Sequence, residues 1–226
     1  MSEKQKRKVF PRAFLIGCDK EGEWMVDWWM RNYIRYNNKT PIIFADFGCS
    51  QRIVDTMNAS TAVCAVMKIN RNPNTPNTKT WFVKPETMWF APAKECVWID
   101  IDCEIQENID GIFDHLVKGK LNMVEDKPWT KRRGEIWYNS GVVGFIDKPK
   151  ILRHWAQMCT NPTKEVGDQE VLHSMLNPIT QVGFINALPN EYNVLRLQVE
   201  HDNYEGPAKI VHWTGAKGKE RIRSMM

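Results

Sequence analysis

The stretch CVWIDIDCE, residues 96–104, decides the fold that we expect for this chain. Its apolar residues Val97 to Ile99 predict a buried strand, and Asp100 and Asp102 follow directly at the strand end. Because side chains alternate along a strand, both carboxylates are expected on one face. Unpaired like charges repel each other and are costly to bury, and a divalent cation such as Mg²⁺ or Mn²⁺ relieves both problems. The ordinary alternative is a solvated loop start.

The first half of the chain alternates between strand and helix patterns. Apolar runs predict strands at 13–17, 40–47 and 61–67, while helical spacing predicts helices at 23–36 and 51–58. A third helix is expected with Pro85 in its first turn and its end near residue 94, after an Asn- and Pro-rich loop at 70–79. This order predicts a parallel α/β sheet, whose ligands bind beyond the carboxyl ends of the strands.

The second half has a different pattern. Residues 105–117 place their apolar side chains on one face, and 127–134 is a charged, proline-containing stretch expected to be an exposed loop. Strands are predicted at 121–125, 137–146, 180–185 and 209–213, and helices at 150–159 and 168–176, the latter with Asp168 as N-cap. With no linker rich in Pro, Gly or Ser, we expect a single domain over residues 1–226.

Composition excludes several classes of protein. The 226 residues are 42% hydrophobic, and no run approaches the roughly 20 apolar residues of a membrane span. Pro11 and Arg12 interrupt the apolar stretch after the basic N-terminus, so no signal peptide is expected there. Six cysteines without a C-x-x-C pair indicate reduced thiols and a cytoplasmic location. The net charge of +4 suits an anionic ligand without indicating nucleic acid, and no pattern indicates an oligomeric state.

Four clusters of polar residues could carry chemistry. They are Asp100 with Asp102; Asn139, Ser140 and Gly141; Gly167, Asp168 and Gln169; and His212 with Gly215, Lys217 and Lys219. Each has an ordinary interpretation as a loop start, a turn, a helix cap or a structural histidine. Their order along the chain is more specific than any one of them.

That order resembles glycosyltransferase family 8, the group that includes glycogenin. The matching segments, between about Phe82 and Lys219, are VKPETMWFAPAKECVWIDIDCEI (83–105), EDKPW (125–129), YNSGV (138–142), GDQ (167–169), the Leu-Pro and Tyr-Asn pairs at 188–189 and 192–193, and His212 to Gly215. The resemblance implies a single-domain glycosyltransferase-A fold with a Rossmann-like, mostly parallel central sheet flanked by helices. It also implies a nucleotide-binding half at about 10–118 and a sugar and acceptor half at about 119–219.

The resemblance further implies a donor, a metal and a set of site residues. The donor would be a nucleotide-sugar, most often a UDP-sugar, with Mn²⁺ (or Mg²⁺) held by Asp100, Asp102 and His212. Transfer to an acceptor hydroxyl would retain the anomeric configuration, with Asp168 and Gln169 as catalytic candidates in either a double displacement or a front-face route. The implied substrate-binding residues are Cys18, Asp19, Lys84, Asp126, Asn139, Ser140, Gly141, Gly215, Lys217 and Lys219.

Some features depart from the family or leave alternatives open. No Pro-Trp pair follows the C-terminal lysines, so the resemblance does not decide between Lys217 and Lys219 as the phosphate-binding lysine. A haloacid-dehalogenase-type phosphatase is disfavoured because the D-x-D lies in mid-chain with Glu104 after it. A sugar nucleotidyltransferase, or a nucleotide-sugar or carbohydrate-binding module without turnover, remains an alternative. The acceptor could be a glycan, a lipid-linked sugar, a protein side chain or a small polyol.

Overall fold

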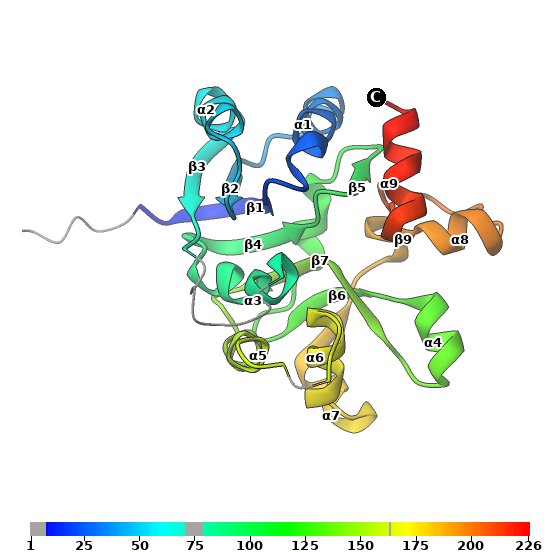
Figure 1. The fold of residues 1–226 in the computed structure, drawn as a ribbon. Coiled ribbons are helices and arrows are strands. Elements are labelled where there is room, and N and C mark those ends of the chain that lie inside the picture. The colour runs from blue at the N-terminus through cyan, green and yellow to red at the C-terminus, as the bar shows by residue number, and fades with distance from the viewer. Residues whose placement is uncertain (1–7, 71–78, 163) are drawn as a thin grey trace, which may run out of the picture.

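A seven-stranded sheet forms the centre of the molecule (Figure 1). The structure is a computed structural model that describes residues 8–70, 79–162 and 164–226, so the predicted 70–79 loop lies almost entirely outside the described residues. The strand order is β3-β2-β1-β4-β7-β6-β8, and β7 alone runs antiparallel to its neighbours. The strands are β1 (Phe10–Cys18), β2 (Ile42–Asp46), β3 (Val63–Lys68), β4 (Ala93–Ile99), β6 (Leu121–Glu125), β7 (Tyr138–Ile146) and β8 (Ile185–Ala187). This confirms the predicted α/β class.

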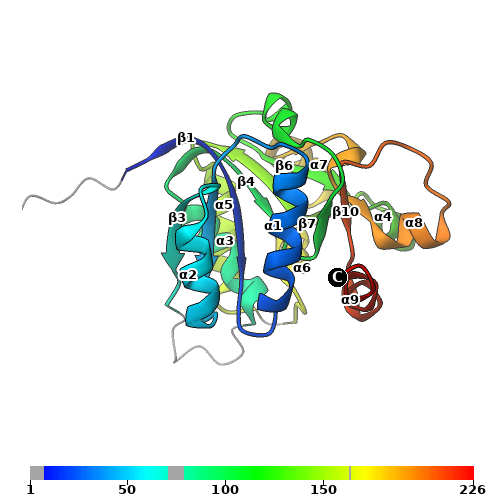
Figure 2. The same ribbon diagram turned by 90° about the horizontal axis from the view of Figure 1, so that it is seen from above.

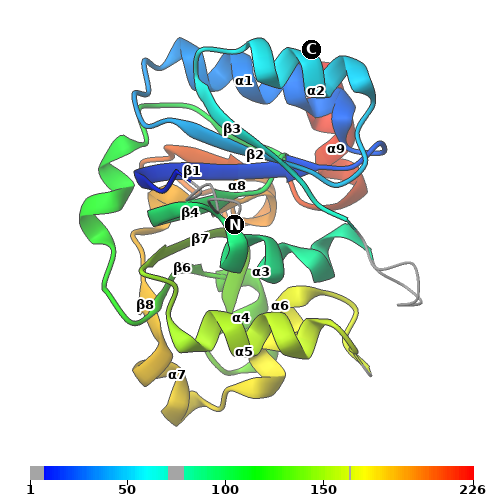
Figure 3. The same ribbon diagram turned by 90° about the vertical axis from the view of Figure 1, so that its left-hand side faces the viewer.

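Helices cover both faces of the sheet (Figure 3). One face packs against α1 (Val26–Arg35) and α2 (Gln51–Ala59), and the other against α3 (Thr80–Phe90), α5 (Lys150–Cys159) and α6 (Asp168–Met175). Along β1, Phe14 joins the core that contains Trp29, whereas its neighbour Leu15 joins the core that contains Trp155. This alternation buries the strand on both faces, which explains its continuous apolar run. Within the described ranges, no helix is long and apolar enough to cross a membrane.

A small second sheet brings the C-terminal part of the chain to the end of β4. It consists of β5 (Cys103–Ile105), β10 (Ile210–His212) and β9 (Val194–Leu195), in that order. The antiparallel pairing of β5 with β10 sets His212 opposite Cys103, one residue after Asp102. Two helices, α8 (Arg196–His201) and α9 (Gly215–Ser224), flank this sheet, and α4 (Lys127–Arg133) lies beside α8 (Figure 2). The remaining elements are α7 (Pro178–Phe184) and the 3₁₀ turns η1 (Glu23–Met25), η2 (Asp110–His115) and η3 (Asn190–Tyr192).

Two expectations for the first half were wrong. Helix α3 begins at Thr80, which places Pro85 inside it, and it ends at Phe90 and not near residue 94. The early end follows from Pro92, because a residue before proline disfavours helical geometry, and Ala91 is accordingly extended with ψ of 129°. The apolar face predicted over 105–117 does not belong to one helix, since the chain there forms β5 and then η2.

Three expectations for the second half were also wrong. The predicted loop at 127–134 is helix α4, whose N-cap Asp126 accepts a hydrogen bond from the Trp129 N–H at 3.0 Å. The predicted strand at 180–185 is mostly helix α7, because the Asn177 side chain caps it and Pro178 suits its first turn. The N-cap of α6 is Gly167, and Asp168 is the first helical residue.

Gly218 tests how α9 is held against the second sheet. A Cβ atom at Gly218 would lie 2.0 Å from the Trp213 carbonyl oxygen, and that backbone atom cannot move without shifting β10 or α9. We therefore expect Gly218→Ala to lower the free energy of unfolding by about 1–3 kcal/mol, measured by urea denaturation. Gly183→Ala is the matched control, since Gly183 is also helical but a Cβ there meets nothing within 4 Å. Equal effects of the two variants would contradict this packing.

Candidate active site

A cleft of about 900 Å³ opens beyond the carboxyl ends of β1 and β4. It collects most of the residues that the sequence predicts for the site: Cys18, Asp19, Lys84, Asp100, Asp102, Asp126, Asn139, Ser140, Gly141, Asp168, Gln169, His212 and Lys219. Gly215 and Lys217 are exposed and are not among its lining residues. The volume is in the range of small-molecule sites, roughly 300–1,000 Å³.

The cleft is acidic although the chain as a whole carries a charge of +4. Among the residues that the structure describes, the lining includes seven carboxylate side chains, from Asp19, Glu21, Asp100, Asp102, Asp126, Asp168 and Glu170, and three lysines, Lys79, Lys84 and Lys219. An anionic ligand entering this cleft would meet net repulsion. The residues therefore favour a site that binds a cation first or together with the anion.

The two aspartates after β4 each have a cationic partner. Asp100 Oδ1 accepts a hydrogen bond from the Trp98 indole at 2.6 Å and lies 3.3 Å from Lys84 Nζ. Asp102 Oδ2 accepts from Lys219 Nζ at 2.5 Å, and its Oδ1 lies 3.2 Å from His212 Nε2. Burial alone would raise the pKa of Asp102, but His212 and Lys219 outweigh it and hold that pKa well below its ordinary value. Asp102 is therefore ionised at neutral pH.

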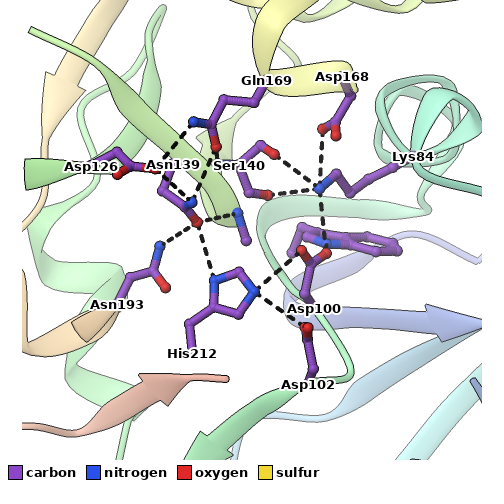
Figure 4. Close-up of polar contacts among 12 residues, drawn as sticks. Lys84, Asp100, Asp102, Asp126, Asn139, Ser140, Asp168, Gln169, Asn193 and His212 are labelled. Atoms are coloured by element: carbon purple, nitrogen blue, oxygen red, sulfur yellow. Dashed lines mark hydrogen bonds and ion pairs between the residues drawn. The ribbon is translucent and has the colours of Figure 1, made fainter. Parts of the chain in front are cut away.

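Lys84 joins two parts of the site in the interior (Figure 4). Its ammonium lies 3.0 Å from Asp168 Oδ2 and 3.3 Å from Asp100 Oδ1, and it donates to the Ser140 carbonyl at 2.9 Å. Burial lowers the pKa of Lys84, but the two carboxylates more than offset this and hold it above its usual value. Burial also raises the pKa of Asp168, an effect that Lys84 opposes. A single buried cation is thus shared by two carboxylates, one directly after β4 and one on α6, and it offsets only part of their charge.

Asn139 sets the orientation of the His212 ring. The Gly141 backbone N–H donates to Asn139 Oδ1 at 2.9 Å, which identifies that atom as the oxygen. His212 Nδ1 lies 3.2 Å from the same oxygen and must donate its hydrogen to it. In the neutral ring the lone pair is then on Nε2, which faces Asp102 Oδ1 at 3.2 Å and Asp100 Oδ2 at 3.9 Å. An unprotonated nitrogen facing two carboxylates is unfavourable, and either a proton on Nε2 or a metal cation between the three groups would relieve the contact.

Gly141 makes this close approach possible. A Cβ atom there would lie 2.1 Å from His212 Cε1 and 2.9 Å from Asn139 Oδ1. Any other residue would displace the ring or the amide. Packing therefore explains part of the Asn-Ser-Gly motif, because only glycine at position 141 lets β7 approach the His212 ring of β10 this closely.

The donor atoms fit a hard divalent cation. Asp102, Cys103 and His212 offer ligand atoms that all lie within 4.8 Å of one another, and Asp100 Oδ2 faces the same histidine nitrogen. Cys103 was not predicted from the sequence. Burial raises the pKa of its thiol well above the ordinary value, and a soft sulfur ligand suits Mn²⁺ or Mg²⁺ less well than oxygen does. Two carboxylates and an imidazole suit Mn²⁺ or Mg²⁺.

Asp126 and Gln169 form a hydrogen-bonded wall on the other side of Asn139. Asp126 Oδ1 accepts from the Trp129 N–H, and its Oδ2 accepts from Asn139 Nδ2 and Gln169 Nε2, both at 3.1 Å. Gln169 Oε1 accepts from Asn139 Nδ2 at 3.1 Å and from the Ser140 N–H at 3.2 Å. Since the Asp126 carboxylate and the Gln169 amide oxygen already have partners, the geometry favours a positioning role for these oxygens over direct sugar binding, whereas Gln169 Nε2 has one partner for its two hydrogens among the described residues.

Asp19 organises the turn after β1 at one end of the cleft. Its Oδ1 accepts from the backbone N–H groups of Glu21 and Gly22, each at 3.1 Å, and its Oδ2 accepts from the Thr80 hydroxyl. These bonds hold the turn after β1 against the start of α3. Cys18 also lines the cleft, with its sulfur 3.4 Å from that of Cys49.

Sequence reasoning missed several residues of the site. Trp98 holds Asp100, and Thr214 and Trp129 line the cleft. Asn193 is fully buried and donates to Asn139 Oδ1 at 2.9 Å. The Tyr-Asn pair at 192–193 was the available signal for Asn193, and the alternation that places Trp98 on the face of Asp100 was the signal for Trp98.

Lys84 allows a direct test of the buried ion network. We expect Lys84→Met to lower the free energy of unfolding by about 3–5 kcal/mol, because it leaves Asp168 buried without its cation. Lys84→Met with Asp168→Leu should recover most of that loss. Burial raises the pKa of Asp168 in the folded state, so the folded protein takes up a proton there more readily than the unfolded chain as the pH falls. The loss of unfolding free energy in Lys84→Met should therefore be smaller at mildly acidic pH than at neutral pH. Urea denaturation at both pH values measures the free energy of unfolding of each variant. A loss of stability in the double variant that equals or exceeds the loss in Lys84→Met would contradict this account of the ion network.

The comparisons with known proteins identify the fold. No family model and no curated protein sequence matches the chain. Among solved structures, the galactosyltransferase LgtC in complex with donor and acceptor sugar analogues is similar over 94% of both chains, with a TM-score of 0.67 and 15% identity. GlyE of Streptococcus pneumoniae TIGR4 is similar over 90% of this chain and 55% of its own, with a TM-score of 0.66 and 14% identity. Mouse xyloside xylosyltransferase 1 is similar over 90% of this chain and 97% of its own, with a TM-score of 0.57 and 12% identity. The chain therefore has the fold of these transferases, which confirms the predicted glycosyltransferase-A fold.

Proposed function

We propose that the protein is a metal-dependent glycosyltransferase that moves a sugar from a nucleotide-sugar, most simply a UDP-sugar, to an acceptor hydroxyl with retention of configuration. The observation that carries the proposal is the convergence of Asp100, Asp102 and His212 on one point of an acidic cleft. The glycosyltransferase-A fold supports it, since such folds place ligands at this edge of the sheet.

Asp100, Asp102 and His212 would hold Mn²⁺ (or Mg²⁺). When bound, the ion would supply positive charge to a diphosphate that becomes more negative as the sugar leaves. Among the described lining residues the carboxylates outnumber the lysines, which supports this requirement because a diphosphate would add further negative charge.

The two lysines have different proposed roles. Lys219 is one-third exposed and pairs with Asp102 at the cleft surface, so it can turn from that carboxylate to a phosphate oxygen. Lys217 is exposed and outside the lining, which favours Lys219 as the phosphate-binding lysine. Lys84 is 3% exposed and already has two carboxylate partners, and we assign it to holding Asp100 and Asp168 in place.

The transfer breaks the bond between the anomeric carbon and a diphosphate oxygen and forms a bond from that carbon to the acceptor oxygen. In a front-face route the acceptor proton passes to the departing phosphate oxygen. In a double displacement a carboxylate first bonds to the far face of the anomeric carbon. Asp168 is the stronger candidate for either role at the sugar, since the amide oxygen of Gln169 already accepts two hydrogen bonds.

Asp102→Asn tests the metal assignment. Replacing one carboxylate oxygen by an amide removes charge from the ion site, so we expect Mn²⁺ affinity and Mn²⁺-dependent release of UDP from UDP-sugars each to fall at least about 100-fold. Calorimetry measures the affinity, and a panel of UDP-sugars with and without Mn²⁺ measures the hydrolysis. The exposed Asp114→Asn is the control and should change neither. If Asp102→Asn bound Mn²⁺ as tightly as the wild type, Asp102 would not be a metal ligand. If the wild type bound donors but turned over none of them across a broad panel of donors and acceptors, the proposal that the protein is an enzyme would be contradicted.

Asp168→Asn tests the catalytic carboxylate. We expect turnover to fall by about 100-fold or more while the dissociation constant of UDP stays within a few fold, because the carboxylate acts at the sugar. Azide added to Asp168→Ala, whose shorter side chain leaves room for the anion, separates the two routes. An inverted glycosyl azide formed by that variant indicates that Asp168 is the nucleophile that azide replaces, and its absence favours the front-face route. Full turnover in Asp168→Asn would exclude both roles.

A further inference from the structure

Helix α4 presents cations and aromatic rings at the sugar end of the cleft. Its seven residues, KPWTKRR, include Lys127, Lys131, Arg132 and Arg133, all exposed, while Trp129 lines the cleft. In the part of the chain that the structure describes, Lys131, Arg132 and Arg133 form no ion pair with a carboxylate. A basic last turn is common, because cations there interact well with the helix dipole. That effect alone does not explain where the guanidinium groups lie.

The guanidinium groups lie over two indole rings, and one of these, that of Trp129, lines the cleft. The Arg133 guanidinium is 5.0 Å from the Trp129 ring centroid and 5.1 Å from that of Trp137, and Arg132 is 5.6 Å from Trp129. The two indoles stack at 5.7 Å, and Trp137 stacks in turn on His173 at 4.0 Å. Stacking on aromatic rings limits the movement of an arginine and keeps its planar set of donors presented.

The site itself fixes this helix in position. Asp126 caps α4 through the Trp129 N–H, and its other oxygen binds Asn139 and Gln169 in the wall of the cleft. Gly134 closes the helix in the left-handed conformation, with φ of 71°. Across from Trp129, α8 contributes Leu197 to the lining, and α4 contacts α8. The cations are therefore attached to the site by a short, capped helix.

We propose that the acceptor is an anionic saccharide, whose sugar ring packs on Trp129 and whose carboxylate or phosphate group binds Arg132 and Arg133. This inference rests on the proposed glycosyl transfer. Charge separation favours it, because the cleft has an excess of carboxylates while the adjoining α4 has only basic charged residues. A neutral acceptor would have no use for these cations, whereas arginine matches carboxylate and phosphate groups with two parallel hydrogen bonds. An indole face adds apolar contact area for a sugar ring.

The test compares saccharides that differ only in charge. Calorimetry with UDP and Mg²⁺ present compares methyl glucuronide and a methyl glucoside phosphate with uncharged methyl glucoside, and transfer assays compare kcat/KM for the same acceptors. We expect one or both charged saccharides to bind about 10- to 100-fold more tightly than the neutral one, with the preference reduced at high salt. The two charged probes distinguish a carboxylate acceptor from a phosphorylated one.

Variants localise the effect. Arg132→Gln with Arg133→Gln should raise KM and Kd for the charged saccharide about 10- to 100-fold, leave kcat and the neutral saccharide nearly unchanged, and leave acceptor-independent donor hydrolysis intact. Arg31→Gln with Arg35→Gln on α1 is the matched control, since both are exposed helical arginines and Arg35 also lies over an aromatic ring. The inference would be overturned if the wild type bound and used charged and neutral saccharides equally well, or if the two double variants had equal effects. Absence of donor hydrolysis by the wild type would instead contradict the proposed function.

Discussion

Repulsion between carboxylates after β4 is the constraint on which the rest of the site depends. Asp100 and Asp102 lie close together at the edge of a buried sheet, and Asp168 is added from α6. Lys84 from α3 and Lys219 from α9 supply the cations, so two helices far apart in the sequence are needed to offset part of this negative charge. The remaining excess of negative charge explains why we assign a metal to this point.

Asn139 connects the two functions that we assign to the cleft. Its oxygen fixes the ring of His212 on the metal side, and its amide nitrogen donates to Asp126 and Gln169 on the sugar side. Asp126 then caps α4, the helix that we propose to bind the acceptor. A change in Asn139 would therefore affect metal, sugar wall and acceptor helix together, which makes this residue a poor choice for separating their contributions.

The sequence predicted elements well where one physical signal dominated. Continuous apolar runs identified β1, β2 and β4, and helical periodicity identified α1, because burial on the sheet imposes those patterns. Helix α4 was missed although Asp126, Pro128, the basic last turn and Gly134 are all ordinary helix signals. Its charge and its proline were interpreted as marks of a loop, and it has no buried residue to create a periodic pattern.

The polar residues of the site were grouped correctly, since most of them line one cleft, but their roles were not accessible from the sequence. The oxygen of Asn139 meets a histidine 73 positions later, and only the second sheet brings them together. Likewise, the choice between Lys217 and Lys219 depends on how α9 turns its side chains, which Gly218 fixes by packing on Trp213.

The most direct measurement of the central claim is the affinity of UDP with and without Mn²⁺, determined by calorimetry on the full chain. In an acidic cleft that needs a cation, we expect Mn²⁺ to tighten UDP binding at least about 100-fold and UDP to tighten Mn²⁺ binding by the same factor, as thermodynamic linkage requires. Equally tight UDP binding in the absence of the metal would contradict the assignment of Asp100, Asp102 and His212 to a metal at the diphosphate.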